Sequence, residues 1–75
     1  MKLPNKFVTY KKSILSKFPI FLSLLSISDL SVGDLYNKTK SQIENAQEFM
    51  DILDCLCLLG KVELIEEVVH YVKTN

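Results

Sequence analysis

The chain has 75 residues, with nine lysines, nine acidic side chains and no arginine, so its net charge is zero. At this length one small domain fits and two do not, and a single core seldom contributes more than about 3–5 kcal/mol to stability. One His, two Cys and two Gly supply neither a nucleophile with its base, nor four metal ligands, nor a glycine-rich phosphate loop. The composition therefore argues against an enzyme and against a bound metal or cofactor.

The charges are divided between the two halves of the chain. Residues 1–40 carry seven lysines and two acidic residues, a net charge of +5, whereas residues 41–75 carry two lysines and seven acidic residues, a net charge of −5. Such a division indicates either a surface that meets an anion at one end or two halves that attract each other in the fold.

The first 27 residues predict a short strand followed by a helix. Phe7 and Val8 are β-favouring residues placed after Pro4, which predicts an extended N-terminal strand segment within residues 1–10. From residue 12 to residue 27, apolar side chains recur every three or four positions and predict the first helix. Pro19 interrupts this helix, and either bends it or makes residues 19–27 a separate helical piece.

The first predicted helix is apolar on two sides. One stripe consists of Ile14, Leu15, Phe18, Leu22 and Leu25. Ile20, Leu24 and Ile27 point roughly away from that stripe, with Phe21 at its flank. A domain of this size covers one such face by itself, so the second face is predicted to be an interface.

The same region also allows a different interpretation. Residues 18–27 follow a lysine-rich start, and Ser26 and Ser28 imitate the small residues of a signal-peptide cleavage site. A secreted or membrane-active peptide is thus an alternative, but the apolar run is about half the ~20 residues of a membrane span.

Cys55 and Cys57 lie two apart in a predicted helix, where their side chains diverge too far for a disulfide. A cytoplasmic, reducing location is expected, without membrane contact.

Two capped helices follow. Ser31 and Asp34 form a capping-box pattern that opens a second helix over residues 32–40. Asn45 and Glu48 repeat the pattern and open a third helix over residues 45–59, which Gly60 ends. Ser41 and Glu44 fit the same pattern, which allows a start about four residues earlier. Cys55 and Leu58 fall on the otherwise polar side of this third helix, where they are predicted to form a surface patch.

Residues 61–73 are rich in β-branched side chains and predict a hairpin that turns near Glu66 and Glu67, with a helix over 62–73 as the competing interpretation. With the hairpin, the whole chain is predicted to be one α+β domain of the winged helix-turn-helix type. It contains three helices, a short N-terminal strand and a C-terminal β-hairpin as the wing.

A winged helix usually suggests DNA, and the charges oppose the usual docking of its third helix. That helix and Glu44 just before it carry four acidic residues and no lysine, and the wing adds three more acidic residues. A small DNA-binding transcriptional regulator is therefore the second functional hypothesis. Any contact with DNA is expected to use the lysine-rich half of the chain. The candidate nucleic-acid-binding residues are Lys6, Lys11, Lys12, Lys17, Lys38 and Lys40.

The sequence also resembles a known family along nearly its whole length. The similar segments are Leu3-Pro-Asn-Lys-Phe-Val8, Ser13-Ile-Leu15, Leu22-Ser-Leu-Leu25, Val32-Gly-Asp-Leu35 and Leu56-Cys-Leu-Leu-Gly-Lys-Val-Glu-Leu64. They resemble the small middle components of bacterial ABC-three-component systems, a group that includes the Lamassu-type defence systems. The resemblance implies a winged-helix subunit that links a coiled-coil ATPase, similar to SMC and Rad50 proteins, to an effector, often a nuclease. Such systems act against phages or plasmids, and no catalytic residue is implied for the small subunit.

The residues and the resemblance together predict a non-catalytic interaction subunit. An apolar surface too large for the chain to cover alone is expected to be covered by a partner subunit or by another copy of the chain. An ATPase and an effector are the expected partners, and contact with DNA is expected through the complex rather than by the isolated chain. The predicted partner-binding residues are Ile20, Phe21, Leu24, Ile27, Cys55 and Leu58.

Overall fold

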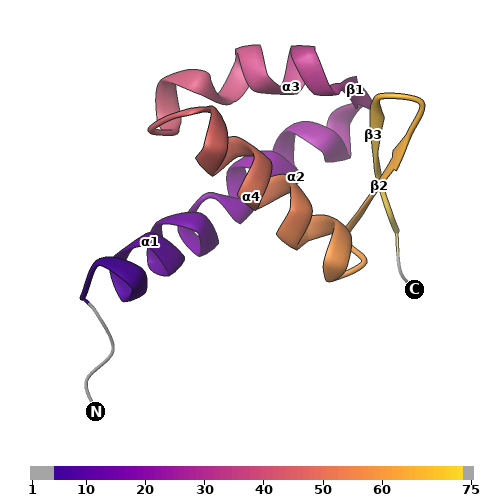
Figure 1. The fold of residues 1–75 in the computed structure, drawn as a ribbon. Helices are drawn as coiled ribbons and strands as arrows, with labels where there is room; N and C mark the ends of the chain where they lie inside the picture. The colour runs from indigo at the N-terminus through magenta and orange to yellow at the C-terminus, as the bar shows by residue number, and fades with distance from the viewer. Residues whose placement is uncertain (1–4, 74–75) are drawn as a thin grey trace.

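The computed structural model describes residues 5–73 and has the predicted α+β class. In chain order its elements are α1 (Asn5–Ser16), α2 (Phe18–Ile27), β1 (Leu30–Ser31), α3 (Val32–Thr39), the short 3-10 helix η1 (Lys40–Gln42), α4 (Ala46–Leu58), β2 (Val62–Ile65) and β3 (Val68–Tyr71). Figure 1 shows α4 crossing α2, α3 running above them, the β2–β3 hairpin closing one edge, and α1 extending away from this body. The arrangement is compatible with a winged helix.

The N-terminal segment differs from its prediction. Residues 5–10 are helical and belong to α1, so the strand predicted within residues 1–10 is wrong there, and residues 1–4 lie outside the described residues. The β-favouring character of this segment is overridden by tertiary contacts. One face of α1 packs on α4, where Tyr10 bonds to Asp51 and Ser13 bonds to Glu48.

The helix predicted over residues 12–27 is divided in two. A turn at Lys17 ends α1, and α2 begins at Phe18 with Pro19 in its first turn. Proline is well placed there, because the first backbone N–H groups of a helix have no partner within it. The separate helical piece is thus the correct one of the two predicted outcomes.

The caps of α3 and α4 confirm their predicted starts. The Ser31 hydroxyl accepts a hydrogen bond from the Asp34 N–H at 3.1 Å, and the Asn45 side chain accepts one from the Glu48 N–H at 2.9 Å. At the end of α4, Gly60 has a φ of 73°, and the Lys61 N–H returns to the carbonyl of residue 56 at 2.9 Å. This left-handed ending turns the chain from α4 into the hairpin.

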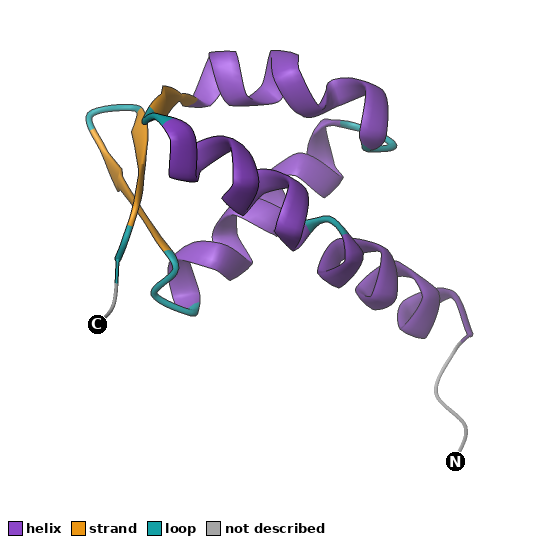
Figure 2. Cartoon of the chain, turned by 180° about the vertical axis from the view of Figure 1, so that it is seen from behind, coloured by secondary structure: helices purple, strands orange, loops and turns teal. Residues whose placement is uncertain are grey.

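The hairpin forms as predicted, and the competing helix over 62–73 does not. β2 and β3 pair antiparallel from Val62 opposite Tyr71 to Ile65 opposite Val68, with the turn at Glu66 and Glu67. The strand that completes the sheet is β1, between α2 and α3, which pairs with β3 and gives the order β1-β3-β2. The view in Figure 2 shows the sheet at the edge of the helical body.

All the helices from α1 to α4, together with β2 and β3, contribute to one hydrophobic core. Its buried side chains are Ile14, Phe21, Leu25, Leu35, Phe49, Ile52, Leu53, Leu56, Val62 and Val69. Phe21 and Phe49 are in contact at its centre, with their ring centroids 5.6 Å apart. The side chains of α3 and α4 that lie outside this core form the surfaces described next.

Candidate functional site

The predicted partner-binding set does not form one surface, and Phe21 is the clearest correction. Its side chain is 0% exposed and packs against Phe49 in the core, so it is not available to a partner. The sequence placed Phe21 at the flank of a second apolar face. The turn at Lys17 lets α2 pack with α4 and β3 independently of α1, which brings Phe21 inside.

The other five members of that set differ in exposure. Ile20, Leu24 and Cys55 are partly buried and pack against the core. Ile27 at the end of α2 and Leu58 at the end of α4 are 82% and 87% exposed. These two side chains contribute almost nothing to the fold and remain available for contact.

The six predicted nucleic-acid-binding lysines also differ in exposure. Lys11 and Lys12 on α1, Lys38 on α3 and Lys40 in η1 are exposed, and the side chain of Lys6 lies outside the described residues. Lys17 is the exception, because its ammonium group forms an ion pair of 2.7 Å with Glu48 and its side chain is only 16% exposed. The prediction that Lys17 faces a nucleic acid is therefore corrected.

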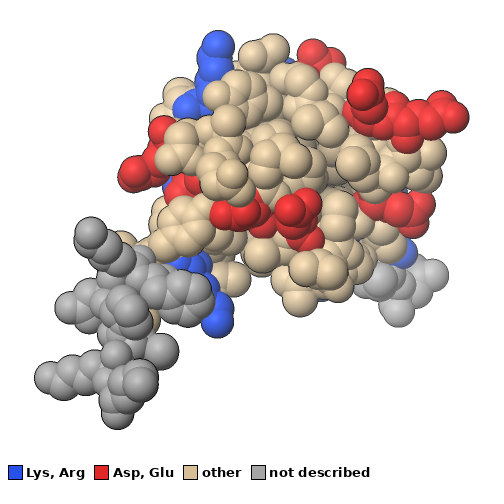
Figure 3. All heavy atoms as spheres, viewed as in Figure 1, with Lys and Arg blue, Asp and Glu red and all other residues tan. Residues whose placement is uncertain are grey.

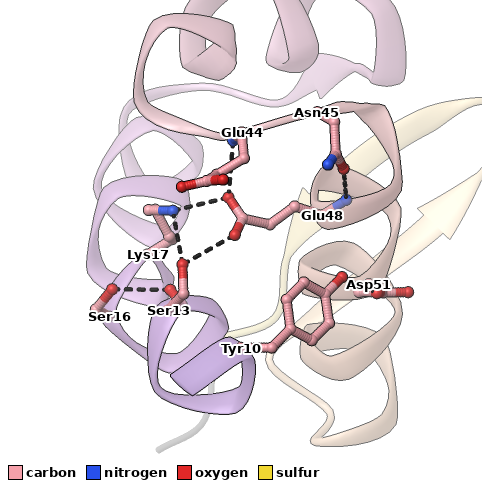
Figure 4. Close-up of polar contacts among 8 residues, drawn as sticks. All are labelled: Tyr10, Ser13, Ser16, Lys17, Glu44, Asn45, Glu48 and Asp51. Atoms are coloured by element: carbon pink, nitrogen blue, oxygen red, sulfur yellow. Dashed lines mark hydrogen bonds and ion pairs between the residues drawn. The ribbon is translucent and has the colours of Figure 1, made fainter. Parts of the chain in front are cut away.

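Glu48 is buried where an exposed acidic residue was expected. Figure 4 shows its carboxylate between α1 and the first turn of α4, where it accepts hydrogen bonds from Lys17, from the Ser13 hydroxyl at 2.9 Å and from the Glu44 N–H at 3.1 Å. Burial alone would raise the pKa of Glu48. The three hydrogen bonds and the charge of Lys17 more than offset burial, so the pKa lies below its ordinary value. The capping-box position of Glu48 was the sequence signal for this role.

A second polar contact joins α1 to α4 beside the first. The Tyr10 hydroxyl donates to the Asp51 carboxylate, and this hydrogen bond is the main cause that raises the pKa of Tyr10 to about 12. Asp51 also accepts a hydrogen bond from Gln47 at 3.0 Å. Of the four acidic residues on and before α4, Glu44 and Asp54 thus remain as exposed carboxylates without these contacts.

The two cysteines are free thiols with partly buried side chains. Burial raises the pKa of Cys57, and the negative charge of Asp54 raises it further. A thiol held in this protonated form is a poor nucleophile, which supports a packing role for Cys57.

An apolar groove between α3 and α4 was not predicted. We call this the α3–α4 groove; it is lined by Val32, Gly33 and Tyr36 from α3 and by Ala46, Phe49 and Met50 from α4. Its floor is formed where Tyr36 packs edge-on against Phe49, with ring centroids 5.1 Å apart. The sequence signal was the four-residue spacing from Val32 to Tyr36 and from Ala46 to Met50, which puts each pair on one helix face.

A second hollow lies beside the hairpin and shares two lining residues with the α3–α4 groove. Ser31, Val32, Gly33, Leu64 and Glu67 line this hollow, so Val32 and Gly33 belong to both. Figure 3 shows acidic side chains at the turn of the hairpin and across α4, with uncharged surface between them. The face that carries α4 and the β2–β3 hairpin is therefore apolar with an acidic border.

Two further observations bear on function. Among residues 5–73 no group of three or more His, Cys, Asp or Glu side chains is arranged to hold a metal ion. No helix in the same range is long and apolar enough to cross a membrane.

Comparison with known proteins gives one positive result. The family model described as ABC-three component (ABC-3C) system Middle Component 7 matches residues 3–71. No curated protein and no solved structure matches the chain. The family match covers nearly the whole chain and agrees with the resemblance of the sequence motifs, although it does not single out the Lamassu type. The chain belongs to the family of ABC-three component system Middle Component 7.

Proposed function

We propose that this chain is a non-catalytic interaction subunit of a cytoplasmic antiphage or anti-plasmid defence complex of the Lamassu type. In this role it links an SMC/Rad50-like ATPase to an effector, most simply a nuclease. Membership of the middle-component family supports a place in a system of several components. The absence of any catalytic constellation in the sequence is consistent with a linking role.

The observation that carries the proposal is the amount of large apolar side chain left on the surface. Among residues 8–73, whose side chains the structure describes, the exposed large hydrophobic residues are Val8, Tyr10, Leu15, Ile27, Met50, Leu58, Leu59, Leu64 and Ile65. Singly exposed hydrophobic residues are ordinary, so the two that matter most are those more than four-fifths exposed, Ile27 and Leu58. Covering a leucine or isoleucine fully stabilises a complex by about 1.5–3 kcal/mol, so Ile27 and Leu58 are worth covering.

Co-expression tests this proposal directly. The full chain carrying an affinity tag is produced together with the ATPase and effector of its own system, and the bound subunits are identified after purification. Wild-type chain is expected to retain both subunits, and Leu58→Glu is expected to lose at least one of them. Gln42→Glu in η1 adds the same charge at an exposed polar position and is expected to retain both. Retention of both subunits by Leu58→Glu and by Ile27→Glu would remove these residues from the interface.

The second candidate is a winged-helix transcriptional regulator that binds DNA by itself. Its support is limited to the exposed lysines of α1 and α3. The helix that would enter the DNA groove, α4, and the β2–β3 hairpin carry acidic side chains that repel phosphates. A gel-shift assay with the isolated chain at two salt concentrations separates the two functions. Binding to a defined duplex with steep salt dependence would favour the regulator.

A further inference from the structure

The α3–α4 groove and the hollow beside the hairpin share Val32 and Gly33, and we refer to the two together as the trough. Val32 and Gly33 line both parts, and Leu64 of β2 extends the apolar lining toward the hairpin. The Val32 N–H donates a 3.0 Å hydrogen bond to the Glu67 carbonyl, which ties the hairpin turn to the first residue of α3. A trough held by backbone bonds in this way is formed before any partner arrives.

Gly33 makes the middle of the trough unusually open. A Cβ atom placed on Gly33 would meet no atom within 4 Å, so nothing in the chain itself fills the space above this backbone. No positive φ requires a glycine at this helical position. The structure therefore gives no internal reason for the missing side chain, whereas close approach of another chain gives one.

The border of the trough has a negative charge. Glu67 lines the hairpin side, Glu66 is next to it in the turn, and Asp54 lies one helical turn beyond Met50 on α4. No lysine is among the residues that line either part. An apolar floor with an acidic border fits an apolar ligand with cationic groups along its sides.

From this shape and charge, we propose that the trough receives one amphipathic helix of a partner subunit. The helix presents apolar side chains at positions i, i+3 or i+4, and i+7, with Lys or Arg beside that stripe. The inference rests on the interaction function proposed above and gives it a docking site. It differs from the predicted contact set, whose most exposed members are Ile27 and Leu58.

A second copy of this chain fits the trough less well. The outward side of α1 carries Val8 and Leu15 seven residues apart, but Lys11 and Lys12 occupy the positions between them. A helix in a groove places an apolar side chain at those middle positions, so α1 would bring charge onto the apolar floor. Nucleic acid fits still less well, because its phosphates would face the acidic border.

Three variants of the full chain test the docking site. Gly33→Met places a side chain in the trough from a position where the Cβ atom meets no atom of the fold within 4 Å. The pair Glu66→Lys with Glu67→Lys reverses the charge of the border. Glu63→Lys is the control for a single charge reversal on the hairpin, because residue 63 points to the opposite face of β2 from Leu64. Each variant is compared with wild type for its affinity for the purified ATPase and effector of the same system, and circular dichroism checks that it is folded.

The expected result is at least a tenfold loss of affinity for one subunit with Gly33→Met and with the double charge reversal, and wild-type affinity with Glu63→Lys. Wild-type affinity in both trough variants would overturn the docking site while leaving the interaction function intact. Failure of the wild-type chain to bind either subunit would overturn both. Sedimentation of the isolated chain completes the test, because a dimer that Gly33→Met abolishes would assign the trough to a second copy and overturn the proposal.

Discussion

Helix α4 meets its neighbours in two contrasting ways. Toward α1, its polar side chains are paired, since Glu48 and Asp51 both accept hydrogen bonds from α1 residues. Toward α3 and the hairpin, its side chains are apolar and border an open trough. Among the described residues no buried side-chain nitrogen or oxygen lacks a hydrogen-bond partner. The polar groups of the α1 contact are therefore satisfied within the chain, whereas the trough leaves apolar side chains such as Met50 and Leu64 exposed.

A substitution in the hydrophobic core, which lies between these two regions, is expected to cause the largest loss of stability. Phe21→Ala removes a fully buried ring that packs against Phe49, and is expected to lower the free energy of unfolding by about 3–5 kcal/mol. Because a domain of this size has little more stability than that, the variant should be largely unfolded in circular dichroism. Ile27→Ala, at an exposed site of the same helix, should stay within about 0.5 kcal/mol of wild type. A folded Phe21→Ala that loses only its partner would restore Phe21 as a contact residue.

Breaking the polar contact between α1 and α4 should be nearly as costly. Lys17→Met leaves the carboxylate of Glu48 buried without its cation, and is expected to lower the free energy of unfolding by about 3 kcal/mol in urea denaturation. The reason is the cost of an uncompensated buried charge rather than the worth of the ion pair itself.

A double variant separates these two explanations. Glu48→Gln together with Lys17→Met removes both charges and keeps a side-chain oxygen for the Glu44 N–H, so most of the lost stability should return. If the double variant is as unstable as Lys17→Met alone, the buried charge is not the cause.

The trough has a built-in strain that a substitution should relieve. Glu66 and Glu67 have φ values of 48° and 66°, a conformation that asparagine and glycine adopt at lower cost in such a hairpin turn. Glu67→Gly is expected to raise the free energy of unfolding by about 1 kcal/mol, and to weaken partner binding because it removes a border charge. A stabilised variant with unchanged partner affinity would contradict the role of Glu67 in the trough.

Local signals predicted most of the fold. The caps at Ser31 and Asn45, the left-handed end at Gly60 and the turn at Glu66 and Glu67 all depend on residues close in sequence, and all are present. The N-terminal strand was wrong because residues 5–10 are part of α1, and the contact that holds this helix there, from Tyr10 to Asp51 of α4, spans 41 positions of the sequence. The strand β1 was missed because its two residues pair with β3 across a similar distance, and one of them also caps α3.

The candidate site was harder to predict for the same physical reason. Periodicity showed that α2 and α4 carried apolar side chains on more than one face, but it did not show which face the core would use. Phe21 lies in the core, whereas Val32 and Tyr36 line the trough. The charges of Lys17 and Glu48 were counted as exposed because each acquires its partner only through the packing of α1 on α4.

The smallest expected effect on stability comes from the exposed hydrogen bond between Tyr10 of α1 and Asp51 of α4. The hydrogen bond to Asp51 raises the pKa of Tyr10 from 10.0 to about 12, so the folded chain holds this proton more tightly than the unfolded chain does. The stabilisation is therefore fully present below pH 10 and is lost as the pH rises through about 12. The tyrosinate absorbance of wild type minus that of Tyr10→Phe should titrate near pH 12, and Asp51→Asn should shift this difference toward pH 10. A wild-type difference that already titrates near pH 10 would mean that α1 separates from α4 in solution, and that the contrast between a complete contact and an open trough does not hold.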